Sequence, residues 1–163
     1  MEEKRSTPML ELLREAASGR QFRMPLAEHL GFHVVQADPG TVTIELKPQE
    51  MHHNIAGTLH GGVLCVIADS AMGLAFGTTV EAGQTFTTVE QKVNVLRPVF
   101  DKTVQAKATV IQRGRTLGLI VCRITDSDGK LVAFATSTYA VLDRESAQGR
   151  EIKQEFGGRP TDG

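Results

Sequence analysis

A short motif between residues 54 and 69 combines groups that could act on a carbonyl compound. His60 precedes Gly61 and Gly62, and a lone carboxylate, Asp69, follows inside an almost wholly apolar run. We expect the two glycines at a helix N-terminus, where backbone N–H groups lack intrahelical acceptors and the helix dipole is positive. Such N–H groups can hold a carbonyl oxygen and the oxyanion that develops on it. The alternative is that the glycines only allow a tight turn into the helix.

Asp69 is the candidate catalytic carboxylate. The apolar residues from Val63 to Phe76 occur on every side of a helix, which predicts a buried helix rather than a surface one. An unpaired carboxylate inside such a helix is costly. Asp69 could attack a carbonyl carbon to form an anhydride, or it could act as a general base on water. The sequence leaves both open, and it also leaves open a structural Asp69 satisfied by backbone N–H groups.

The spacing of the motif predicts a site shared between two subunits. Asp69 lies nine residues after His60, which on a helix is about 900° of rotation and roughly 13 Å of rise. One chain can hardly bring Gly61 and Asp69 to the same small group. Two copies with antiparallel helices can do so across a twofold axis, and we therefore expect a homodimer.

The elements that must position these residues follow from hydrophobic periodicity and turn residues. We expect helices at 7–18 and from Pro25 to Leu30, and the apolar helix after residue 60. The expected strands are 32–36 and 41–46 before that helix, and 86–96, 103–112, 117–125 and 131–142 after it. Short connections between the later strands favour antiparallel pairing. The predicted fold class is therefore α+β, a curved antiparallel sheet wrapped around one long central helix.

Composition narrows the possible functions. The chain has 163 residues and a net charge of −1, which gives no electrostatic reason to expect nucleic acid or an anionic membrane as partner. No apolar run is long enough to span a membrane, and the polar N-terminus leads into no signal-type segment. Cys65 and Cys122 lie in apolar patterns, which predicts reduced core thiols in a cytoplasmic protein. We expect an N-terminal helical extension at 1–24, one domain at 25–142 and a polar tail at 143–163.

The motif and the order of elements together resemble a known family. The residues Asn54, Gly57, His60-Gly61-Gly62 and Asp69 follow the pattern Asn-x5-His-Gly-Gly-x6-Asp of hotdog-fold acyl-CoA thioesterases of the phenylacetate-degradation type. The resemblance extends roughly from Leu30 to Leu142. It implies hydrolysis of an acyl- or aryl-CoA thioester to the free acid and CoA. It implies no cofactor, since coenzyme A is part of the substrate.

The resemblance also implies roles for individual residues. The Gly61 amide polarises the thioester carbonyl, and Asp69 comes from the other protomer. Asn54 and His60 orient the carbonyl or the loop, and the Thr88 hydroxyl lies near the acid. Similar dimers commonly pair into homotetramers. Each side chain also has a structural alternative: His60 bonded to backbone, Asn54 stabilising a turn, and Thr88 serving only as a strand residue.

Two further sets of residues are weaker candidates. Glu90 lies two residues after Thr88, which predicts the same strand face. It could be a competing acid, and the favoured alternative is a solvated side chain at the strand edge. His52 and His53 lack a carboxylate or cysteine that would complete a metal site with His60, so we expect no metal and treat both as surface residues.

A pocket between protomers would take the acyl group, with these candidate lining residues: Met51, Ile55, Met72 and Phe76.

The phosphates of CoA need cations or exposed N–H groups. Besides Gly62, the candidate substrate-binding residues are Arg113 and Arg115, which flank Gly114 in a short connection. Arg97 and Lys92 are further candidates, and solvated surface charge is the alternative for each. Two other functions remain open: a hotdog dehydratase or hydratase, whose His-Phe-Pro-Gly motif is missing, and a non-catalytic acyl-CoA-binding protein.

Overall fold

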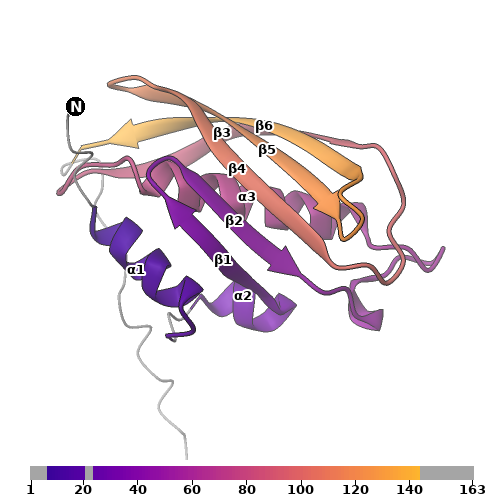
Figure 1. Ribbon diagram of the computed structural model, residues 1–163. Coiled ribbons are helices and arrows are strands. Elements are labelled where there is room, and N and C mark those ends of the chain that lie inside the picture. Colours follow the sequence, from indigo (N-terminus) through magenta and orange to yellow (C-terminus); the bar gives the residue numbers. More distant parts are fainter. Residues whose placement is uncertain (1–6, 21–23, 144–163) are drawn as a thin grey trace, which may run out of the picture.

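Six antiparallel strands and one long helix make up the fold in the computed structural model, which describes residues 7–20 and 24–143 (Figure 1). The helices are α1 (Pro8–Ala17), α2 (Pro25–Leu30) and α3 (Gly61–Gly77), with a 3₁₀ turn at Glu50–His52. The strands are β1 (Phe32–Asp38), β2 (Thr41–Leu46), β3 (Thr85–Val95), β4 (Val104–Arg113), β5 (Leu117–Asp126) and β6 (Leu131–Leu142).

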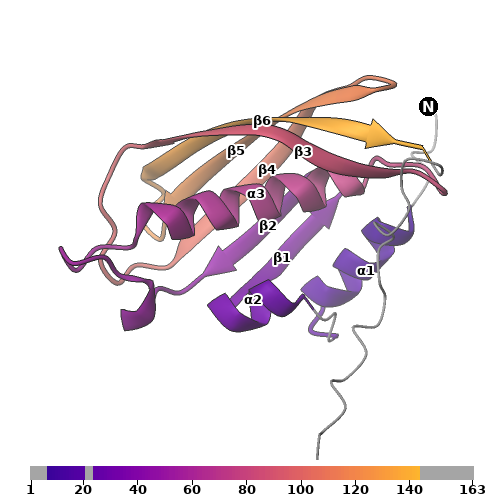
Figure 2. The same cartoon turned by 180° about the vertical axis from the view of Figure 1, so that it is seen from behind.

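The strands form one sheet in the order β1-β2-β4-β5-β6-β3, and every neighbouring pair is antiparallel. The helix α3 connects β2 to β3, which lies at the far edge of the sheet. Figure 2 shows α3 lying across one face of the sheet, with α1 and α2 beside β1. The predicted α+β class and the curved antiparallel sheet around one long helix are therefore confirmed.

The helix α3 is buried on one side only. Its buried residues include Leu64, Ile67, Ala71, Met72 and Phe76, which pack into the core under the sheet. On its other side Gly62 and Asp69 are exposed, and Cys65, Val66 and Gly73 are only half-buried. The prediction that the sheet buries this helix on most sides is thus wrong for a single chain, because the sheet covers only one face of α3.

Two residues expected to line a pocket between protomers belong to the core instead. Met72 and Phe76 are both 0% exposed. The Phe76 ring stacks on the Tyr139 ring with centroids 5.3 Å apart and meets the Phe86 ring edge-on at 5.5 Å. Aromatic pairs in these geometries add to the stabilisation from burial. This aromatic cluster fixes α3 against β3 and β6.

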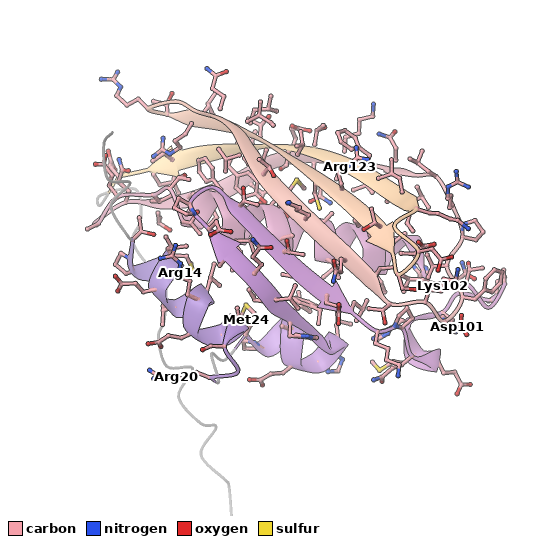
Figure 3. All side chains as sticks on the ribbon, in the orientation of Figure 1. Arg14, Arg20, Met24, Asp101, Lys102 and Arg123 are labelled. Carbon is pink, nitrogen blue, oxygen red and sulfur yellow. The ribbon has the colours of Figure 1, made fainter. Side chains whose placement is uncertain are left out.

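The N-terminal helix α1 belongs to the same core. Thr7 caps it by accepting the Leu10 N–H, and Met9, Leu10 and Leu13 are buried. Arg14, labelled in Figure 3, donates from Nε to the Ala37 carbonyl of β1 at 3.4 Å. The predicted tail lies outside the described residues except for Asp143. Among the described residues, no helix combines the length and the apolar character that crossing a bilayer requires.

Both cysteines are free thiols, but only one is a core residue. Cys122 on β5 is buried, and burial raises the pKa of its thiol to about 12. Cys65 is half-buried on the open side of α3, so the expectation that it is a core thiol is wrong. The reason is again that one chain leaves this side of the helix uncovered.

Candidate active site

The first turn of α3 presents one free backbone N–H group. The helix begins at Gly61, as predicted, and His60 is its N-cap. The His60 Nδ1 accepts the Gly62 N–H at 2.8 Å, while the His60 carbonyl accepts the Val63 N–H at 2.9 Å. The Gly61 N–H has no acceptor within residues 7–20 and 24–143. A carbonyl oxygen that approaches this turn would therefore meet the Gly61 amide.

Asn54 organises the loop that leads into this turn. Its Oδ1 accepts the N–H groups of Ala56 at 2.9 Å and Thr58 at 3.2 Å, and its Nδ2 donates to the Thr58 hydroxyl at 2.9 Å. Gly57 adopts a φ of 72°, which glycine tolerates far better than other residues. The side-chain bonds of Asn54 thus match the turn-stabilising alternative from the sequence.

The two preceding histidines are not both surface residues, in contrast to the prediction. His52 is 1% exposed, its Nδ1 accepts the Gln49 N–H at 3.0 Å, and its carbonyl accepts the His60 N–H at 2.8 Å. His53 is half-buried with Nε2 2.7 Å from the Phe100 carbonyl. The hydrogen bonds of both histidines therefore help to hold the loop in place. The described part of the chain holds no group of three or more metal-ligating side chains.

The Asp69 carboxylate is exposed in the single chain but has fixed partners on one oxygen. Its Oδ1 accepts the Thr88 hydroxyl of β3 and the Tyr139 hydroxyl of β6, each at 3.2 Å. The Tyr139 hydroxyl also lies 3.2 Å from the Asp69 carbonyl oxygen. Burial raises the pKa of Tyr139, and the nearby Asp69 charge raises it further. The Asp69 Oδ2 has no hydrogen-bond partner among the described residues.

Thr88 and Asp69 were expected near one another, but Tyr139 was not among the predicted residues. Its inward position follows from the alternation of β6, which places Ser137 and Tyr139 on the buried face. The β3–β6 register then sets Tyr139 directly opposite Thr88. The sequence signal was a single buried tyrosine on an alternating strand, and a buried hydroxyl needs a partner.

Glu90 does not share the face of Thr88, so that prediction is wrong. A bulge between Thr88 and Glu90 shifts the β3–β6 register and places Glu90 opposite Thr138. The Glu90 Oε1 accepts the Thr138 hydroxyl at 2.8 Å on the sheet face away from α3. The extra residue reverses the alternation, and it removes Glu90 as a competing acid beside Asp69.

The chain does not bring all the candidate residues together. Gly61 and Asp69 lie on one uninterrupted helix, where eight residues correspond to about 12 Å of rise. Arg113 lies near the C-terminal end of α3. Its guanidinium is 5.3 Å from the Phe76 ring centroid, and one Nη is 3.4 Å from the Gln84 amide oxygen. Burial lowers the pKa of Arg113. Arg115 is exposed in the turn that follows β4.

Comparisons with known proteins agree on one family. A family model described as "Thioesterase superfamily" matches residues 56–133. Human acyl-coenzyme A thioesterase 13 is 30% identical over 125 residues, covering 76% of this chain and 86% of that protein. A 1,4-dihydroxy-2-naphthoyl-CoA hydrolase from Listeria monocytogenes is 30% identical over 118 residues, covering 72% and 96%.

Solved structures agree on the fold. A thioesterase from Haemophilus influenzae superposes with a TM-score of 0.74 at 26% identity, covering 88% of this chain and 96% of that one. The PaaI protein from the phenylacetic acid degradation operon of Escherichia coli superposes with a TM-score of 0.71 at 22% identity, covering 81% and 94%.

Proposed function

This chain belongs to the thioesterase superfamily, and on that premise we propose that it hydrolyses the thioester of an acyl- or aryl-CoA to the free acid and CoA. The names of two relatives, an acyl-coenzyme A thioesterase and a naphthoyl-CoA hydrolase, support this substrate class. The observation that carries the proposal is the pairing of a free N–H at the start of α3 with a carboxylate held by one oxygen only.

The Gly61 amide acts on the substrate carbonyl. Its N–H donates to the thioester oxygen, and the bond strengthens as negative charge develops on that oxygen. The helix dipole adds positive potential at the same point. His60 supports this role, because its ring engages the Gly62 N–H and leaves the Gly61 N–H for the ligand. Gly62 contributes the absence of a side chain, and Asn54 keeps the loop in place.

Asp69 supplies the second half of the reaction through Oδ2. As a nucleophile it attacks the carbonyl carbon, the CoA thiolate leaves, and water then hydrolyses the mixed anhydride. As a general base it takes a proton from water while that water attacks the carbonyl carbon. Either way the thiolate leaves, and it is protonated to free CoA. The Thr88 hydroxyl on Oδ1 orients the carboxylate in both routes.

We further propose that each site combines Gly61 of one protomer with Asp69 of another. The rise of about 12 Å between them on α3 supports this, since one small thioester cannot span it within one chain. Two other features support it: β3 is an edge strand, and the Asp69 side of α3 is open. Pairing of two β3 edges would satisfy unpaired backbone groups and bring two α3 helices side by side. Pairing of such dimers into a tetramer stays a prediction.

Of the two arginines proposed to bind CoA phosphates, Arg115 is the better placed. Its side chain is exposed, whereas the Arg113 guanidinium is engaged with Gln84, the Gly114 carbonyl and the Phe76 ring. The phosphates of CoA stay near solvent on this proposal, where an exposed guanidinium can pair with them in a bidentate manner.

Replacement of Asp69 tests the proposal. Asp69→Asn keeps an oxygen for the Thr88 and Tyr139 hydroxyls but removes the charge, so we expect thioester hydrolysis to fall by a factor of about 100 or more. The measurement is thiol release from a panel of aryl-, short-chain and long-chain acyl-CoAs. Glu90→Gln is the matched control, because this carboxylate lies on the other sheet face. Full activity of Asp69→Asn would contradict the proposal, and CoA-ester binding without turnover by the unaltered protein would indicate a non-catalytic binder.

A further inference from the structure

We infer that Tyr139 is a positioning residue for Asp69, which fixes the carboxylate through Oδ1 and leaves Oδ2 as the oxygen that reacts. The inference rests on the proposed function, since it assigns a role within that reaction. Tyr139 is 1% exposed, so its hydroxyl acts on the carboxylate from the protein interior and does not touch the substrate.

The carboxylate needs an external constraint. Asp69 is exposed on the open side of α3, where an unrestrained side chain would exchange between rotamers. Two hydroxyls converge on Oδ1, one from each strand beneath the helix. With both donors on one oxygen, the lone pairs of Oδ2 remain available. Fixing the attacking atom in this way is how a supporting residue increases a reaction rate.

Tyr139 is the more rigid of the two donors. Its ring stacks on Phe76 and lies edge-on to Phe86 with centroids 5.7 Å apart. On the helix side, a Cβ built at Gly73 would lie 3.5 Å from the hydroxyl, so α3 packs directly against the tyrosine. Thr88, by contrast, is exposed on β3. We therefore assign the position of the carboxylate to Tyr139, with Thr88 as the second donor.

The helix backbone at this point is held by the same two strands. The Tyr139 hydroxyl lies 3.2 Å from the Asp69 carbonyl oxygen, and Gln91 Nε2 of β3 donates to the Cys65 carbonyl at 3.0 Å. A purely structural role for Tyr139 would need only the bond to the Asp69 carbonyl. Such a role predicts a loss of stability on removal of the hydroxyl, with no separate effect on catalysis.

Tyr139→Phe removes only the hydroxyl and keeps the stacked ring. We expect kcat to fall about tenfold, the effect of losing one hydrogen bond to a charged group. KM should stay unchanged, because the hydroxyl does not touch the substrate. The control is Thr138→Val, which removes the neighbouring hydroxyl on the opposite sheet face and should leave both constants unchanged. An unchanged kcat in a folded Tyr139→Phe variant would contradict the inference.

A spectroscopic signature tests the contact without any turnover. The chain contains one tyrosine and no tryptophan, so its tyrosine fluorescence reports Tyr139 alone. An ionised carboxylate that accepts the phenol hydrogen quenches this emission. We expect Asp69→Asn to increase the emission, while Glu90→Gln leaves it unchanged. No increase in a folded Asp69→Asn variant would overturn the contact.

The activity of Tyr139→Phe and that of the unaltered protein together separate the failure of this inference from that of the proposed function. An active enzyme whose Tyr139→Phe variant is equally active contradicts only the role of Tyr139. An unaltered protein that releases thiol from no CoA ester contradicts the proposed function and the catalytic role of Tyr139 with it.

Discussion

At the scale of single residues, the two glycine amides at the start of α3 differ in their partners. The Gly62 N–H is engaged by the His60 ring, whereas the Gly61 N–H is free within the described residues. This difference makes Gly61 the donor in the proposed reaction, and it can be tested on one atom.

Gly61→Pro removes that hydrogen with little change of backbone. Proline is favoured at the first helical position, and His60 already has the extended φ of −62° and ψ of 133° that a following proline requires. We expect kcat for thioester hydrolysis to fall by a factor of about 100 or more, as for loss of one oxyanion donor. Gly61→Ala is the control, because it keeps the N–H and its Cβ would lie 3.9 Å from the nearest side-chain atom, Val95 Cγ2. Equal kcat values for the two variants would exclude the Gly61 amide.

The residues of the candidate site that lie close in sequence could be predicted from the chain itself. Thr88, 19 residues after Asp69, was predicted only through the family resemblance, and Tyr139 was not predicted. The motif from Asn54 to Asp69 is a local pattern, and helix physics alone places Gly61 at the N-terminus. Tyr139 follows Asp69 by 70 residues, and their contact depends on how α3 packs against β6. The sequence also predicts the wrong environment for His52, whose burial depends on how the chain around it folds.

At the scale of elements, the close fit of α3 against the sheet depends on small residues. A Cβ built at Gly118 of β5 would lie 2.9 Å from the Phe76 Cζ and closer still to Cε2. We expect Gly118→Ala to lower the free energy of unfolding by about 1–3 kcal/mol, because overpacking forces the Phe76 ring to move. Gly73→Ala is the control within α3, where the nearest atom is 3.5 Å away, and it should be neutral or stabilising by about 0.5–1 kcal/mol. Urea denaturation measures both, and a Gly118→Ala variant as stable as the unaltered protein would contradict the packing argument.

Most strands could be predicted because turn residues bound them. The segment expected at 131–142 is β6 as found, and the one expected at 86–96 is β3 displaced by a single residue. The bulge between Thr88 and Glu90 could not be predicted, because Thr88, Val89 and Glu90 are all exposed. An exposed stretch has no alternation of buried and exposed residues whose interruption would mark an extra residue. Because of this extra residue, the sequence predicts the wrong sheet face for Glu90.

At the scale of the whole molecule, the proposed shared site makes a quantitative prediction for mixed subunits. Asp69→Asn and Gly61→Pro chains would each form inactive homodimers, but a heterodimer would contain one site with both groups intact. Random pairing of equal amounts of the two chains makes half of the dimers mixed, and one of their two sites is intact, so we expect roughly a quarter of the normal activity. Native mass spectrometry confirms the heterodimer. Its presence without any recovered activity would contradict a site shared between chains.

The uninterrupted course of α3 from Gly61 to Gly77 has a consequence for newly made protein. On the proposed mechanism, a lone chain carries both reacting groups but holds them too far apart to act on one thioester. On the proposed arrangement, hydrolysis requires the encounter of two chains, so specific activity would decline on dilution below the dimer dissociation constant. A newly synthesised chain would then hydrolyse no thioester until it binds a second copy.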